Sequence, residues 1–190
     1  MIGNRTKIEI RFAGEGGQGL LSAATILGES LTLDTDLYVC QSQNYGPESR
    51  GGLSYSDLII SEGEIDFPKV KRPDILVCMS NEAYLKFKTQ VESKAIFLLL
   101  IDPDLVTAAP YTLQGGGRLI RVPAAALSEQ IFGSRIGANS VLLGTLHAVL
   151  SLGSRDALES VLRKTWPGLA GKNVQAFRKG IAMAERVEPL

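Results

Sequence analysis

Cysteine and histidine are scarce in this chain of 190 residues, which contains two cysteines and a single histidine. An iron–sulfur cluster takes four cysteine ligands, and the chain has no C-x-x-C run. Neither Cys40 nor Cys78 has a histidine or a second thiol near it in sequence that would activate it. We therefore expect no metal cluster on this chain, and we expect both cysteines to be core residues.

The chain also lacks net charge and a long apolar run. Lysine plus arginine and aspartate plus glutamate number 20 each, so no overall field attracts nucleic acid or acidic lipid. The longest apolar stretch, around residues 138–152, is too short and too interrupted to span a bilayer. With no recognisable signal peptide, the sequence predicts a cytoplasmic protein that binds no nucleic acid and does not insert into a membrane.

What the chain does have is apolar periodicity. Its length and its hydrophobic content of 45% suit one domain, residues 1–190, with its own core. Up to Pro123 the chain contains both apolar runs typical of strands and segments whose apolar residues recur at helical spacing. After Pro123 only segments with helical spacing follow. We expect strands at 7–14, 37–41, 53–61, 74–80, 95–102 and 115–123, and helices at 20–31, 81–90, 124–131, 138–152, 155–166 and 172–186.

The connections between these elements predict the fold class. Parallel strands need a crossover of roughly a dozen residues or more, which is usually helical. Only a polar loop separates strand 37–41 from strand 53–61, so this pair should be antiparallel. We therefore predict an α/β fold with three layers (α/β/α), a mixed, mostly parallel sheet and a helical C-terminal third.

The stretch AGEGGQGLL, residues 13–21, joins the first predicted strand to the first predicted helix. Gly14, Gly16 and Gly19 have the G-x-G-x-x-G spacing of dinucleotide-binding loops, in which a helix N-terminus receives a phosphate. A nicotinamide site also needs an acid at the end of the second strand, where this chain has glutamines, and Glu15 would repel a pyrophosphate. A tight turn or a contact surface is therefore favoured, with a dinucleotide site or a site for another ligand as the alternatives. The candidate contact residues of this loop are Gly14, Gly16, Gly17, Gln18 and Gly19.

A second polar segment, SQNYGPESRGG at residues 42–52, connects the predicted antiparallel pair. Pro47 fixes φ and Gly46 gives the backbone freedom before it, as in a turn. Arg50 precedes two glycines, so its guanidinium can reach a carboxylate or a phosphate. Polar loops at strand ends often carry binding residues, so we expect this segment to contact a ligand or another subunit near the glycine loop. The alternative is a solvated hairpin. The candidates are Gln43, Asn44, Tyr45, Gly46, Pro47, Glu48, Arg50, Gly51 and Gly52.

The only histidine lies in the most apolar predicted helix. His147 is surrounded in sequence by apolar residues, which favours a buried or interfacial histidine over a catalytic base. Asn139 should cap the N-terminus of this helix, and Gly153 should end it.

Four stretches together carry a resemblance to a known family. They are AGEGGQG, SQNYGPESRGGLSYSDLIIS, IDFPKVKRPDILVCMSNEAYLKF and GANSVLLGTLHAVLSL, which cover most of residues 7–152. On these stretches the chain resembles the gamma subunits of 2-oxoacid:ferredoxin (acceptor) oxidoreductases, most closely those that act on 2-oxoglutarate. The resemblance is strongest in the two loops taken together.

The resemblance implies a subunit of a multi-chain enzyme that converts a 2-oxoacid and coenzyme A into an acyl-CoA, carbon dioxide and a reduced acceptor. Thiamine diphosphate, Mg²⁺ and iron–sulfur clusters are expected on the partner chains, which are the alpha and beta subunits and a ferredoxin-like delta subunit where one exists. Electrons would leave these chains to ferredoxin or another low-potential acceptor.

For this chain itself the resemblance implies no catalytic residue. The sequence agrees, because it has no Gly-Asp-Gly motif to seat a diphosphate with Mg²⁺. We expect no cofactor bound by this chain alone and no activity of the isolated chain, while contact with CoA stays open. The alternative function is a free-standing nucleotide-binding module or an NAD- or FAD-dependent oxidoreductase.

Overall fold

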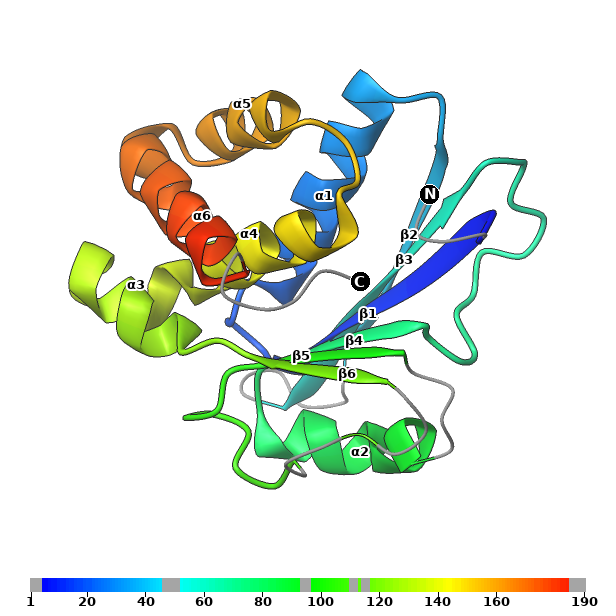
Figure 1. The fold of residues 1–190 in the computed structure, drawn as a ribbon, viewed down its shortest axis with the longest axis horizontal. Helices are drawn as coiled ribbons and strands as arrows, with labels where there is room; N and C mark the ends of the chain where they lie inside the picture. The colour runs from blue at the N-terminus through cyan, green and yellow to red at the C-terminus, as the bar shows by residue number, and fades with distance from the viewer. Residues whose placement is uncertain (1–4, 46–51, 93–96, 110–112, 114–116, 185–190) are drawn as a thin grey trace.

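The computed structural model describes residues 5–45, 52–92, 97–109, 113 and 117–184. Six strands form one mixed sheet in the order β2-β3-β1-β4-β5-β6 (Figure 1). The strands are Lys7–Glu15 (β1), Tyr38–Tyr45 (β2), Leu53–Ser61 (β3), Ile75–Cys78 (β4), Leu98–Ile101 (β5) and Arg118–Arg121 (β6).

Strand β3 runs antiparallel to both of its neighbours. It pairs with β2 on one side and with β1 on the other, where the register runs from Lys7 opposite Ser61 to Glu15 opposite Leu53. The pairs β1–β4, β4–β5 and β5–β6 are parallel. The predicted mixed, mostly parallel sheet is confirmed. Strands β2 and β3 are antiparallel because the short connection between them leaves no room for a crossover helix.

Six helices accompany the sheet in the described part of the chain. They are Leu20–Asp34 (α1), Asn81–Glu92 (α2), Ala124–Phe132 (α3), Ala138–Leu150 (α4), Arg155–Thr165 (α5) and Ala170–Ala184 (α6), with 3-10 turns at Arg135–Gly137 (η1) and Pro167–Leu169 (η2). None of the helices in the described residues combines the length and the apolarity that crossing a bilayer requires.

The helices cover both faces of the sheet and so give the predicted three layers. α1 and the C-terminal helices α3 to α6 lie on one face, and α2 lies on the other (Figure 1). Along β1, Ile8, Ile10 and Phe12 belong to the apolar cluster under α1 and α4, whereas Ala13 belongs to the cluster under α2. This division follows from the period of two in a strand, which turns successive side chains to opposite faces.

Helices α4 and α6 pack closely because each has a glycine where they cross. A Cβ atom at Gly144 would overlap the carbonyl oxygen of Phe177, and one at Gly180 would overlap that of Val141. Thr145 Oγ1 donates a hydrogen bond to the Gly180 carbonyl across the same crossing, at 3.0 Å. The crossing therefore admits no larger side chain at either glycine without a shift of a helix.

The face under α2 carries a buried ion pair between adjacent strands. Arg11 on β1 donates through Nε and Nη2 to the two carboxylate oxygens of Asp57 on β3, both at 2.7 Å, and the residues are 4% and 3% exposed. The guanidinium packs against the rings of Tyr55 and Phe87, 4.6 Å from each centroid, and also donates to the Val70 carbonyl. Burial raises the pKa of the Asp57 carboxyl, and its hydrogen bonds to Arg11 oppose that rise. Either charge alone would be costly at this position.

Candidate functional site

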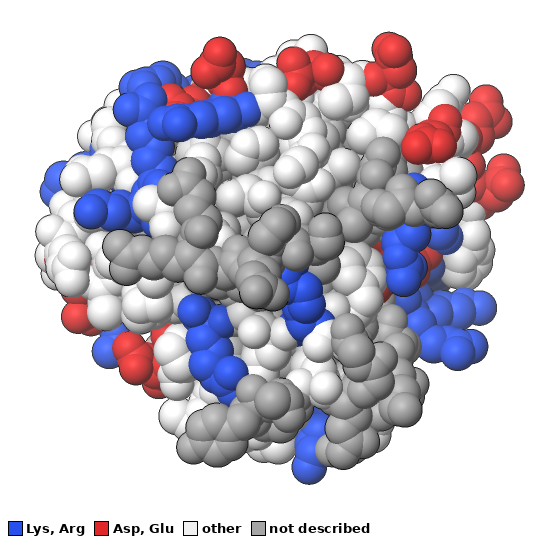
Figure 2. Space-filling view, in the orientation of Figure 1, with Lys and Arg blue, Asp and Glu red and all other residues white. Residues whose placement is uncertain are grey.

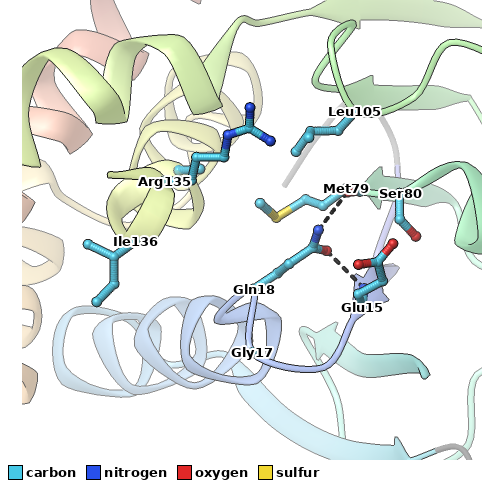
Figure 3. A pocket seen from close by; sticks show the side chains of 9 residues that line it. Glu15, Gly17, Gln18, Met79, Ser80, Leu105, Arg135 and Ile136 are labelled. Atoms are coloured by element: carbon cyan, nitrogen blue, oxygen red, sulfur yellow. Dashed lines mark hydrogen bonds between the residues drawn. The ribbon is translucent and has the colours of Figure 1, made fainter. Parts of the chain in front are cut away.

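The chain leaves the neighbouring strands β1 and β4 toward opposite faces of the sheet. After β1 it enters α1 on one face, and after β4 it enters α2 on the other (Figure 1). In open α/β sheets such a divergence opens a crevice beyond the carboxyl ends of the strands, where ligands bind. A cavity of about 500 Å³ lies at this place (Figure 3). It is lined by Glu15, Gly17, Gln18, Met79, Ser80, Leu105, Arg135, Ile136 and Ala138.

The glycines of the 13–21 loop form a strand-to-helix turn beside this cavity. Gly17 and Gly19 have φ angles of 95° and 73°, in the left-handed region that favours glycine. A Cβ atom at Gly14 would overlap the amide oxygen of Gln18, so the space above this glycine is already filled. Gly17 has open space on its Cβ side and borders the cavity.

Gln18 connects the ends of the two strands that form the crevice. Its amide oxygen accepts a hydrogen bond from the Glu15 amide at 2.8 Å, and its amide nitrogen donates to the Met79 carbonyl at 2.9 Å (Figure 3). Dinucleotide-binding folds place a pyrophosphate over the glycines of this loop. Here the side chains of Gln18 and Asn139 lie against Gly14 and Gly19 in that space. The geometry therefore disfavours the dinucleotide alternative.

The structure brings the two predicted contact segments to one edge of the sheet. The Gly16 amide donates to the Gly52 carbonyl at 3.1 Å, which joins the glycine loop to the end of segment 42–52. Tyr45 pairs with Ser54, one residue beyond the Glu15–Leu53 pair on the other side of β3. The two segments are near one another as expected, but the strands that lead into them, β1 and β2, are not the parallel neighbours that this expectation assumed, because β3 lies between them.

The residues of segment 42–52 fall into two groups. Gln43 and Asn44 are exposed residues of β2, which continues to Tyr45 rather than ending at residue 41 as predicted. The backbone ladder with β3 extends through these polar residues because pairing does not depend on side-chain polarity. The remaining candidates of this segment lie outside the described residues: Gly46, Pro47, Glu48, Arg50 and Gly51.

Charged groups stand on opposite sides of the cavity. Figure 3 shows Arg135 and Ile136 on one side, and Glu15 and Ser80 on the other. Arg135 Nε donates to the carboxylate of Glu129 at 2.9 Å, and this hydrogen bond raises the pKa of Arg135. Both side chains of this ion pair are well exposed, so water screens it and a ligand can compete for the guanidinium. The cavity thus offers a cation to an anionic ligand group and a carboxylate opposite it.

A smaller, apolar cavity of about 170 Å³ adjoins the first. Gly17 and Ile136 line both cavities. Ile136 is 65% exposed although its side chain is large and apolar. Ile136 therefore presents an apolar side chain to solvent at the border of both cavities. The other residues of the small cavity are Gly19, Ser22, Phe132, Trp166, Leu169 and Asn173.

Asn139 does not cap α4, so this prediction is wrong. The helix follows directly on η1, where the Ala138 amide already donates to the Arg135 carbonyl, and the N-cap is Gly137. Asn139 is instead buried in the first turn, and its Nδ2 donates to the Gly19 carbonyl at 3.1 Å. Its Oδ1 accepts a hydrogen bond from the Ser140 amide at 2.8 Å, so the two ends of the Asn139 amide together fasten the glycine loop to the first turn of α4.

His147 and Cys78 occupy positions that favour packing roles over catalysis. His147 is half-buried, and burial lowers its pKa. Its Nδ1 lies 3.2 Å from the Leu152 carbonyl oxygen, beyond the end of α4 at Leu150, where Ser151 rather than Gly153 takes the left-handed cap. Burial raises the pKa of the Cys78 thiol to about 12, so it stays protonated and unreactive. Among the described residues, no group of three His, Cys, Asp or Glu side chains is placed to hold a metal ion.

Sequence reasoning missed the part of the cavity that lies outside the two loops. Met79 and Ser80 are the last two residues of the predicted strand 74–80, but β4 ends at Cys78, so both lie beyond its carboxyl end, where ligands bind in such sheets. The Ser80 hydroxyl accepts a hydrogen bond from the Ala83 amide at 3.1 Å, in the first turn of α2. No sequence signal points to Arg135 and Ile136, because only the packing of α3 and α4 carries η1 to the crevice.

The comparisons with known proteins decide the family. The family model described as pyruvate ferredoxin/flavodoxin oxidoreductase matches residues 9–183. The chain belongs to this family. One relative, 2-oxoglutarate synthase subunit KorC of Methanothermobacter marburgensis, is 40% identical over 176 residues, which cover 90% of this chain and 94% of that protein. The family predicted from the four stretches is therefore confirmed.

Solved structures of this family share the fold. The gamma subunit of a keto/oxoacid ferredoxin oxidoreductase from Geobacter sulfurreducens matches with a TM-score of 0.79 and 32% identity, over 95% of this chain and 99% of that one. A 2-oxoglutarate:ferredoxin oxidoreductase from Magnetococcus marinus, with 2-oxoglutarate, coenzyme A and succinyl-CoA bound, matches with a TM-score of 0.87. That match has 21% identity and covers 98% of this chain and 32% of the longer one, so it shows the fold alone.

Proposed function

We propose that this chain is the gamma subunit of a multi-chain oxidoreductase that converts 2-oxoglutarate and coenzyme A into succinyl-CoA and carbon dioxide, with ferredoxin or a similar acceptor reduced. The observation that carries the proposal is the 40% identity with a 2-oxoglutarate synthase subunit over nearly the full length of both chains. The family membership and the fold agree with it.

Within the proposed enzyme this chain would shape a binding surface, and its partners would supply the redox chemistry. Cys40 lies on β2 and Cys78 on β4, with β3 and β1 between them, so the two thiols do not fit a common cluster. We therefore assign thiamine diphosphate, Mg²⁺ and iron–sulfur clusters to the alpha, beta and delta subunits. The isolated chain is expected to be inactive.

The proposed contact surface combines the crevice with the two loops beside it. Coenzyme A carries phosphates on a long, mostly neutral chain, and a cavity of about 500 Å³ with Arg135 at one side suits a part of such a ligand. Gln18 would fix the shape of the crevice, because its side chain bridges the ends of β1 and β4. Arg50 is a second candidate anion ligand on the adjacent segment.

The proposed function is tested by isolating the complex. The chain, tagged after Leu190, is purified from its native cells, and the chains that copurify are sequenced. We expect alpha and beta subunits with a thiamine diphosphate motif, and CoA-dependent reduction of methyl viologen that is faster with 2-oxoglutarate than with pyruvate or 2-oxoisovalerate. A chain that purifies alone, without partners or activity, would contradict the proposal.

The proposed contact residues are tested in the same complex. Arg135→Ala and Arg50→Ala should each raise the KM for CoA by about tenfold, the effect of one lost charged hydrogen bond, and leave the circular dichroism spectrum unchanged. Lys86→Ala is the matched control, since Lys86 is an exposed cation on α2, on the opposite side of the sheet. An unchanged KM and unchanged subunit assembly would remove the arginine concerned from the contact surface.

A further inference from the structure

The last two helices carry an excess of positive charge in a chain that is neutral overall. Residues 155–184 contain six basic and two acidic side chains, a net charge of +4, whereas the whole chain has a net charge of zero. Figure 2 shows lysine and arginine gathered at the upper left, where Figure 1 places α5 and α6, while acidic side chains gather at the upper right. The surface formed by α5 and α6 is therefore positively charged.

A groove of about 430 Å³ lies on this cationic surface. Arg163 of α5 and Arg178 and Lys179 of α6 line it together with Gln175. All four side chains belong to exposed residues. Lys179 has no ion pair within the described ranges, so its charge is available to a partner.

A nearly buried carboxylate holds the arginines in place. Glu159 of α5 accepts hydrogen bonds from Arg178 at 2.7 and 2.8 Å and from Arg155 at 2.9 Å, and Arg163 lies 3.8 Å away. The Glu159 side chain is 9% exposed, whereas the three arginine side chains are about half exposed. One carboxylate thus orients three cations and leaves them with surplus positive charge. Arginines fixed in this way lose less conformational entropy when they bind a further anion.

We propose that this groove between α5 and α6 docks an acidic surface of another subunit of the enzyme, a proposal that rests on the proposed function. Charge complementarity selects the occupant, because surplus cations extend along both helices rather than converging on one point. A small anion seated between the arginines would meet the Glu159 carboxylate. An acidic protein surface reaches the outer cations, including Lys179, without approaching that carboxylate.

The test measures binding of this chain to its separated partner subunits by surface plasmon resonance, at NaCl concentrations from about 50 to about 400 mM. Lys179→Glu should weaken binding by about tenfold at low salt, mainly through a slower association, and should flatten the salt dependence. Lys179→Arg keeps the charge and should bind as the unaltered chain does. Lys86→Glu places the same charge reversal on α2 and should also leave binding unchanged.

The outcomes separate this proposal from the proposed function. An unaltered chain that binds no partner subunit overturns both. A chain that binds its partners, with Lys179→Glu matching it in affinity and salt dependence, overturns the docking surface alone. Saturable binding of inorganic phosphate that Lys179→Glu abolishes, with subunit binding unchanged, would also overturn it by assigning the groove to a small anion.

Discussion

The two faces of the central sheet are stabilised in different ways. The face under α1 and α4 belongs to a cluster of 32 buried apolar residues, and the cluster under α2 has 10, counted over the described residues. The face under α2 also contains a buried ion pair between Arg11 and Asp57. A wide apolar layer specifies its packing by shape, whereas a narrow layer gains specificity from a few directional bonds.

The largest expected effect comes from removing one charge of the buried ion pair on the face under α2, which is the narrow face of the sheet. Arg11→Met keeps much of the side-chain volume but leaves Asp57 buried without its cation, which should lower the free energy of unfolding by about 3–5 kcal/mol. Urea denaturation measures this change. In the double variant Arg11→Met/Asp57→Leu no buried charge remains, and most of the lost stability should return. Equal losses in the single and double variants would show that the charges are not what distinguishes this face.

On the face under α1 and α4, which is the wide face of the sheet, the corresponding test adds a methyl group at a close helix crossing. Gly180→Ala places a methyl group against the Val141 carbonyl where α4 and α6 cross, which should cost about 1–3 kcal/mol because backbone has to move. Gly171→Ala is the matched control in the same helix, where a Cβ atom meets nothing within 4 Å. The control should be neutral or stabilising by up to about 1 kcal/mol. Equal urea midpoints for the two variants would contradict the close crossing.

A smaller effect is expected where the wide face meets the crevice. Asn139→Ala removes the hydrogen bond to the Gly19 carbonyl and should cost about 1–2 kcal/mol. Because the bond fastens the glycine loop, amide hydrogen exchange of residues 16–22 should speed up more than exchange in the core strands. Asn44→Ala, at an exposed position of β2, is the control and should change neither quantity. Uniform acceleration over the whole sheet would assign Asn139 a global role instead.

The smallest effect concerns the ion pairs of the outer helices. Hydrogen bonds from Arg178 and Arg155 lower the pKa of Glu159 from its ordinary value of 4.5 to about 2. A carboxyl whose pKa is lower in the folded state stabilises the fold above its ordinary pKa, and this contribution is lost as the pH falls from 4.5 to about 2. The Tm difference between the unaltered chain and Glu159→Gln should therefore be constant above pH 5 or so and shrink below it. A difference that grows on acidification would contradict the assignment.

The sequence predicted the elements of the wide face well because apolar periodicity determines them. Strand 53–61 has the predicted bounds, and α4 ends two residues before its predicted end. The antiparallel β2–β3 pair also followed from the sequence, through loop length alone. The strand at 37–41 was cut short, since its last residues are polar and only their pairing with β3 makes them a strand.

The candidate site was predicted in part. The two loops were found because glycine, proline and polar residues at strand ends are visible in sequence, and the structure brings Gly16 and Gly52 together. Arg135 and the contact of Asn139 with Gly19 depend on how α3 and α4 pack, which no local pattern encodes. The partner of Arg11 was equally invisible, because the charged residues of an alternating strand are expected to face water.

The order of elements along the chain has a consequence for synthesis on the ribosome. The apolar surface of α1 is made early, while the helices α4 and α5 that cover it are among the last to be made. Strand β1, the first made, gains its partners β3 and β4 only after many further residues. A nascent chain that has passed β6 but lacks α4 therefore exposes its largest apolar surface, and this interval is when chaperone binding should matter most.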